Sequence, residues 1–130
     1  RGWVLTPHPG EMGRLIDRPP QWVNAHRGTV GQELASRWGV TVLLKGAPTV
    51  ISGPGRIYIS TAGNSGMGSA GMGDVLTGVI AAFIGQGMEP LEAAALGAYV
   101  HGLAGDAAGE KGKRGLTASD CLAAVQLILD

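Results

Sequence analysis

The feature that most constrains the fold of this chain is a glycine-rich run, GNSGMGSAGMGD at residues 63–74, which leads directly into the apolar stretch VLTGVIAAFI. Glycine permits positive φ and lets the backbone approach a ligand closely. The first amides of a helix lack intrahelical partners and point outward at the positive end of the helix dipole. A glycine-rich loop that opens a helix is therefore typical of an anion-binding site, although a simple flexible turn has the same composition.

Asp74 closes this loop and is the first candidate for a catalytic residue. A carboxylate repels phosphate, but it can accept the proton of a hydroxyl that attacks a phosphoryl group. The loop is not a Walker motif, because no Gly-Lys-Ser/Thr follows it. It is also a poor dinucleotide fingerprint, since that motif opens the first strand-helix unit and needs an acidic residue about 20 residues later.

Five segments along the chain help to identify its family. In chain order they are LTPHPGEM at 5–12, LKGA at 44–47, GMGDVLTG at 71–78, HGLAGD at 101–106 and TASD at 117–120. Together they cover nearly the whole chain and resemble the ATP- or ADP-dependent NAD(P)H-hydrate dehydratases, which belong to the ribokinase-like superfamily. The first three segments together are not shared by sugar kinases. The resemblance implies an α/β fold, a layered α/β/α domain of which residues 1–130 form the C-terminal part.

The resemblance also implies an activity. In this family the hydroxyl of a hydrated NADH or NADPH is phosphorylated by ATP or ADP with Mg²⁺, and loss of phosphate then restores the nicotinamide ring. Asp74 would deprotonate that hydroxyl, and no residue is assigned as a protein ligand of a metal. The hydrate would contact His8, Pro9, Gly10, Glu11 and Asp74, while the nucleotide and its transferring phosphoryl group would contact Lys45, Gly46, Ala47, Pro48, Thr49, Gly71, Met72 and Gly73.

Each of the main candidates has a structural alternative. His8 lies between two prolines on an extended backbone, and its loop position favours a binding role over packing. Glu11 could simply complement a helix dipole, and Lys45 could form a salt bridge at the end of a strand, where ligands bind in open α/β sheets. His101 is more typical of a buried, hydrogen-bonded histidine than of a metal ligand, because no carboxylate or cysteine lies four residues away.

The apolar pattern predicts strands and helices in the first 60 residues, and only helices in the rest of the chain. Residues 40–44 are apolar except for Thr41, which is typical of a strand buried on both faces. A turn at Gly53-Pro54-Gly55 should join two strands as an antiparallel hairpin. We expect strands at 3–6, 40–44, 49–52 and 56–60, and helices at 11–16, 24–38, 74–84, 90–108 and 118–129. In the second helix, Val30, Leu34 and Trp38 should share the apolar face.

Composition and charge exclude several classes of protein. The formal net charge is zero, so no basic excess suggests a nucleic-acid partner. The longest apolar stretch, residues 75–84, is too short and too glycine-interrupted to span a membrane, and no signal peptide is visible. The single cysteine, Cys121, excludes an intrachain disulfide and suits a reducing compartment. We therefore expect a cytoplasmic enzyme.

The chain opens directly on a strand, so we expect the N-terminal half of the domain to come from elsewhere. A homo-oligomer or a complementary chain would supply it. Few strands are available to flank residues 40–44, so the isolated chain should expose a strand edge and associate. Two other functions stay open: a ribokinase-like small-molecule kinase, such as a vitamin-precursor kinase, which should lack the HPGE segment, and a non-catalytic nucleotide-binding fragment.

Overall fold

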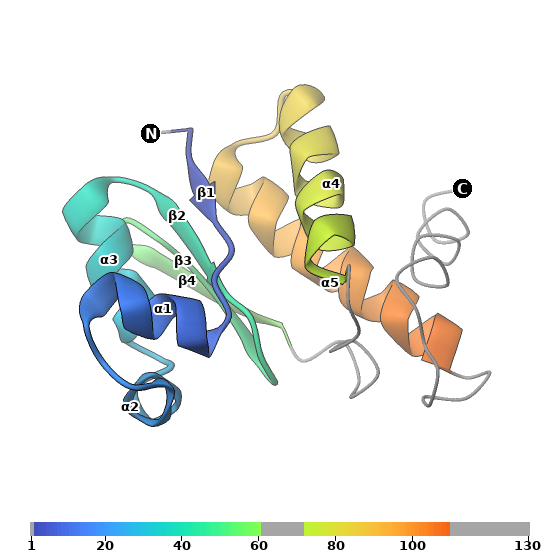
Figure 1. Ribbon diagram of the computed structural model, residues 1–130. Coiled ribbons are helices and arrows are strands. Elements are labelled where there is room, and N and C mark those ends of the chain that lie inside the picture. Colours follow the sequence, from blue (N-terminus) through green and yellow to red (C-terminus); the bar gives the residue numbers. More distant parts are fainter. Residues whose placement is uncertain (1, 61–71, 110–130) are drawn as a thin grey trace.

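A computed structural model of the chain describes residues 2–60 and 72–109, in which a sheet lies between two layers of helices (Figure 1). One face of the sheet is covered by α1 (Pro9–Ile16), α2 (Pro20–Ala25) and α3 (Val30–Trp38). On the other face α5 (Pro90–Gly109) packs against the strands, and α4 (Met72–Gly85) packs against α5. This layered α/β/α arrangement confirms the predicted fold class. The helix expected at 118–129 lies outside the described residues.

The four strands are arranged in sequence order, β1 (Val4–Leu5), β2 (Thr41–Leu44), β3 (Thr49–Gly53) and β4 (Arg56–Ser60). β1 pairs with β2 in parallel, after the chain has passed through α1, α2 and α3. The other two pairings are antiparallel, and the predicted hairpin is confirmed, with Gly55 at φ +80° in its turn. Positive φ is a conformation that glycine adopts without the strain that a Cβ would cause.

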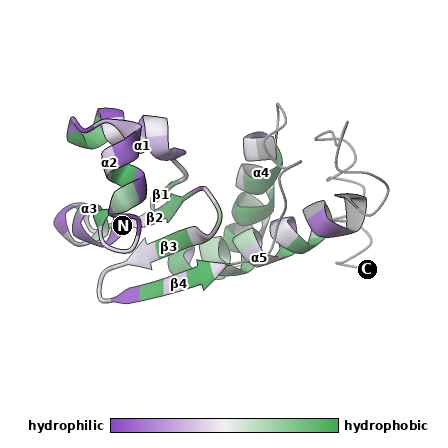
Figure 2. Ribbon diagram, turned by 90° about the horizontal axis from the view of Figure 1, so that it is seen from below, coloured by the Kyte–Doolittle hydropathy of each residue, from purple (hydrophilic) through white to green (hydrophobic). Residues whose placement is uncertain are grey.

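The predicted burial of β2 on both faces is confirmed. Its side chains alternate, so Val42 and Leu44 pack into the cluster under α1, α2 and α3. Leu43 points to the opposite face and packs with Ile51 and the residues of α4 and α5. Figure 2 shows that α4 and α5 are largely hydrophobic along their length, as expected for helices that contribute to a core. No helix in residues 2–60 and 72–109 combines the length and apolar character needed to cross a membrane.

The single helix predicted over residues 24–38 is wrong, because the chain forms α2 and α3 with a break between them. Gly28 and the β-branched Thr29 fall in the break, and both residue types have low helix propensity. The end of α3 is as expected, with Gly39 in the left-handed conformation at φ +66°.

Trp38 was expected on the buried face of this helix but is 48% exposed, whereas Val30 and Leu34 are buried. A step of four residues exceeds one helical turn, so a residue eight positions on lies about 80° around the helix from the first. That rotation carries Trp38 away from the sheet.

Candidate active site

His8 and Glu11 are held together at the start of α1. The backbone N–H of Glu11 donates to Nδ1 of His8 (3.1 Å), and the backbone N–H of His8 donates to Oε1 of Glu11 (3.0 Å). This reciprocal pair is a capping box with histidine in the place usually taken by serine or threonine. Both side chains keep about half of their surface exposed, at 51% and 48%. They are therefore fixed in position and still accessible to a ligand.

The helix begins at Pro9, two residues before the predicted start at residue 11. The missed signal was a proline at the first helical position followed two residues later by glutamate, a pattern that favours a helix start. Glu11 therefore has a structural role at the start of α1, which was the alternative to substrate binding. Contact of His8 and Glu11 with a substrate stays a prediction.

The carboxylate of Glu11 is electrostatically stabilised. The hydrogen bond from the backbone of His8 is the main cause that lowers the pKa of Glu11, and the charges of His8, Lys45 and Arg14 lower it further, while partial desolvation opposes them. Glu11 therefore carries its negative charge well below neutral pH. A fixed carboxylate of this kind can accept hydrogen bonds from hydroxyl or amide groups of a ligand.

Lys45 contacts two other predicted site segments, the one before α1 and the start of α4. It follows β2 directly, and its backbone N–H donates to the carbonyl oxygen of Pro7 (2.9 Å), just before α1. Its Nζ lies 3.1 Å from the position that a Cβ would occupy on Gly73, in the first turn of α4. The structure thus brings the residue 7–11 segment, the end of β2 and the start of α4 to one place, at the carboxyl end of a strand, where ligands bind in open α/β sheets.

The start of α4 has the charge arrangement of an anion-binding site. The helix begins at Met72, two residues before the predicted start, and Asp74 lies exposed in its first turn. The ammonium of Lys45 lies beside the positive end of the helix dipole, and both favour an anion at this point, whereas the carboxylate of Asp74 in the same turn opposes it. Gly71 and the rest of the glycine-rich run at 61–71 lie outside the described residues.

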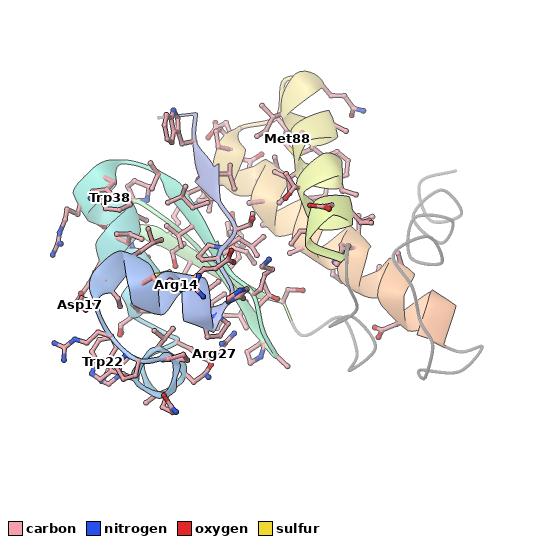
Figure 3. All side chains as sticks on the ribbon, in the orientation of Figure 1. Arg14, Asp17, Trp22, Arg27, Trp38 and Met88 are labelled. Atoms are coloured by element: carbon pink, nitrogen blue, oxygen red, sulfur yellow. The ribbon has the colours of Figure 1, made fainter. Side chains whose placement is uncertain are left out.

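The loop that follows Lys45 is braced from two sides. Thr49 donates its hydroxyl to the carbonyl oxygen of Gly46 (3.0 Å). On the other side, Nη2 of Arg27 donates to the carbonyl oxygens of Lys45 (3.3 Å) and Pro48. Figure 3 shows Arg27 beside α2, toward the end of the sheet at which this loop lies. Burial lowers the pKa of Arg27 from its ordinary value, but the group remains protonated at neutral pH.

Among the described residues, no group of three or more histidine, cysteine, aspartate or glutamate side chains could hold a metal ion. Magnesium that is bound mainly through nucleotide phosphates and water needs no such group. His101 is buried at 8% exposure on α5, in agreement with the preference for a structural histidine.

Comparison with known proteins decides the family. A model of the NAD(P)H-hydrate dehydratase family matches residues 1–127 of this chain. The chain belongs to the NAD(P)H-hydrate dehydratase family. Among its relatives, the bifunctional NAD(P)H-hydrate repair enzyme Nnr of Moorella thermoacetica is 52% identical over 121 residues, which are 92% of this chain and 23% of that protein.

Two solved structures relate this dehydratase-family chain to a known fold. The ADP/ATP-dependent NAD(P)H-hydrate dehydratase of Bacillus subtilis, co-crystallised with ATP and Mg²⁺, has a TM-score of 0.91 at 28% identity, over 97% of this chain and 46% of that one. A ribokinase-like superfamily protein of Enterococcus faecalis has a TM-score of 0.78 at 31% identity, over 97% and 43%. The fold is therefore ribokinase-like. This chain spans about a quarter of the curated repair enzyme and about half of each solved structure.

Proposed function

We propose that residues 1–130 are the C-terminal part of a single ribokinase-like domain that dehydrates hydrated NADH or NADPH, with ATP or ADP as the phosphoryl donor. The enzyme would be a carbon-oxygen lyase of nicotinamide nucleotide repair. The observation that carries this proposal is the position of Lys45, which contacts Pro7 through its backbone and approaches Gly73 through its side chain. Three segments of the family pattern thereby meet at one site, and family membership supplies the reaction.

The reaction needs phosphorylation because hydroxide is a poor leaving group and phosphate is a good one. The hydroxyl oxygen of the hydrate attacks the terminal phosphorus of the nucleotide, the bond to the departing nucleotide breaks, and Asp74 takes the hydroxyl proton. The carbon-oxygen bond then breaks and phosphate leaves with the bonding electron pair. The neighbouring ring carbon loses a proton to phosphate or water, and the electron pair of that carbon-hydrogen bond restores the double bond of the nicotinamide ring. Magnesium on the nucleotide phosphates would neutralise charge that develops during transfer.

The remaining residues bind and orient. The ammonium of Lys45 and the first amides of α4, from Met72 and Gly73, would hold the transferring phosphoryl group, with Gly71 before them. Residues 45–49 would line the nucleotide side. On the hydrate side, Nδ1 of His8 accepts a hydrogen bond and Nε2 lies 3.5 Å from Oε1 of Glu11, so an N–H on Nε2 would be shared between Glu11 and the substrate. Glu11 would accept hydrogen bonds from the substrate.

We further propose that the rest of the substrate wall comes from the remainder of the domain, in the same protein or in an associating chain. The supporting observation is that the chain spans 46% of the related dehydratase structure. The substrates are small metabolites, and we place the enzyme in the cytoplasm, where reduced nicotinamide nucleotides are used.

The first prediction tests Asp74 as the catalytic base. Asp74→Asn keeps the size of the side chain, so nucleotide affinity should be retained while kcat falls by about 10²-fold or more, the usual contribution of general base catalysis. The assay is recovery of NADH absorbance from its hydrate with ATP or ADP, in a preparation that contains the complete domain. Asp17→Asn, the same change at an exposed position at the end of α1, is the control.

Retention of more than half of the activity by Asp74→Asn would remove Asp74 from the mechanism. A phosphorylated hydrate that accumulates without recovery of NADH would favour the kinase alternative. Nucleotide binding with no turnover of any hydrate would favour a non-catalytic binding module.

A further inference from the structure

Arg27 makes an unusual set of contacts for a residue in a helix connection. It lies between α2 and α3, and its Nη1 donates to Oδ1 of Asn24 at the end of α2 (2.9 Å). Its Nη2 reaches across to the loop after β2 and donates to the carbonyl oxygens of Lys45 and Pro48. One guanidinium therefore ties a helix to a loop that lies 18 and 21 residues further along the chain.

The loop is shaped around this guanidinium. A Cβ added at Gly46 would lie 2.6 Å from Cζ of Arg27, so the arginine packs directly against the glycine. The two carbonyls that accept from Nη2 lie on either side of Gly46, and Thr49 holds the carbonyl of Gly46 itself. The backbone on both sides of Gly46 is thus fixed by side chains.

The chemistry of this contact requires arginine. A planar guanidinium presents several N–H groups in a rigid fork, whereas the ammonium of lysine is a compact point charge on a flexible stem. Hydrogen bonds from a charged donor are stronger than those between neutral groups, and partial burial of Arg27 reduces competition from water. Arg27 is only partly buried, so it is not a core residue.

We propose that Arg27 is a positioning residue for the nucleotide: it fixes the loop at residues 45–48 so that Lys45 Nζ is aimed at the first turn of α4. This inference rests on the proposed function, because it assigns Lys45 to phosphate binding. Arg27 acts through the loop and does not touch the phosphoryl group. Asn24 in turn orients Arg27 and extends the same support into α2.

The second prediction tests this role with Arg27→Met and Arg27→Lys in the complete protein. Both should raise the Kd and KM for ADP or ATP by about 10- to 100-fold, by analogy with the loss found when groups that orient metal ligands are removed. Arg27→Lys should not rescue, because its ammonium lacks the rigid fork that contacts Asn24 through Nη1 and the loop carbonyls through Nη2. The melting temperature without nucleotide should change little, and kcat at saturating nucleotide should fall less than kcat/KM. Arg37→Met, at an exposed arginine of α3, is the matched control.

Asn24→Ala provides a second variant that leaves the loop carbonyls and the core unchanged. It should weaken nucleotide binding in the same direction by a smaller factor, and it should have no further effect when combined with Arg27→Met, because the two residues act as one unit. Titration calorimetry with ADP and with ATP, each with Mg²⁺, measures both effects.

Nucleotide affinity within twofold of the unaltered protein in Arg27→Met and Asn24→Ala would overturn the positioning role and leave the proposed function standing. Full rescue by Arg27→Lys would also overturn it, since charge alone would then suffice. Failure of the unaltered protein to bind either nucleotide would overturn the proposed function, and this inference with it.

Discussion

Strands β2 and β4 are both rich in apolar residues, yet they have opposite environments in one sheet. All four residues of β2 are buried, whereas β4 is exposed at four of its five positions, with Ile59 63% exposed. β2 has a strand on each side and helices over both faces. β4 pairs with β3 alone among the described strands. The place of a strand in the sheet, more than its own apolar content, therefore determines its burial.

The register explains which face of β4 is left open. Ile57 lies opposite Ser52 and Ile59 lies opposite Val50, so both isoleucines are on the face that α3 covers at β2 and β3. Tyr58 lies opposite Ile51 on the other face, against which α5 packs. Figure 2 shows the hydrophobic colour of β4 running along the outer edge of the sheet. An exposed apolar edge strand is a surface on which chains associate.

The largest expected difference between the two strands is in the free energy of unfolding. Leu43→Ala in β2 removes a fully buried side chain between two packed layers and should cost about 2–5 kcal/mol. Ile59→Ala in β4 should cost less than about 1 kcal/mol, because most of its side chain is already in water. Urea unfolding followed by tryptophan fluorescence measures both. Equal costs for the two substitutions would contradict the contrast between the strands.

In β3, the strand that lies between β2 and β4, we expect a smaller change in the free energy of unfolding, and a change of opposite sign. Ser52 is 1% exposed, and its hydroxyl has no hydrogen-bond partner in the described part of the chain. Ser52→Ala removes a buried unsatisfied group and should stabilise the protein by about 1 kcal/mol. Ser36→Ala, on the exposed side of α3, is the control and should change stability by less than about 0.5 kcal/mol. A loss of stability in Ser52→Ala would show that the hydroxyl has a partner.

The smallest effect on stability is expected at the open edge. Ile59→Lys should change the free energy of unfolding by less than about 0.5 kcal/mol, because the site is exposed. It should nevertheless lower the average mass of the purified 130-residue chain in light scattering at several concentrations, since a lysine on an edge strand opposes pairing with another chain. Trp38→Lys, at an exposed apolar residue of α3, should leave the mass unchanged. A single-chain mass for the unaltered protein at every concentration would refute association through β4.

Much of this fold could be predicted because its signals are local. The hairpin followed from Gly53-Pro54-Gly55, and the burial of β2 followed from its continuous apolar run. We expected few strands to flank β2, and in the structure β1 and β3 lie beside it, while the open edges among the described strands are at β1 and β4. The pairing of β1 with β2 was not assigned from the sequence, because β1 has only two residues and its partner strand is distant in sequence.

The site was predicted in part for a similar reason. The segments at 7–11, at 45–49 and before Asp74 could be recognised by their residues, and the structure brings the first and second together with the start of α4. Arg27 could not be found in this way, because its role depends on carbonyl oxygens that become its neighbours only after folding. The capping box could have been found, since its signal is contained in four consecutive residues.

The parallel pairing of β1 with β2 has a kinetic consequence. The connections from β2 to β3 and from β3 to β4 are short, so these pairings close small loops. The pairing of β1 with β2 closes a loop that contains three helices, and the entropy cost of closure grows with loop length. The hydrogen bond from Lys45 to Pro7 can form only after this closure. We therefore expect the meander from β2 to β4 to form early, and the edge that carries the candidate site to be among the last described parts of the molecule to assemble.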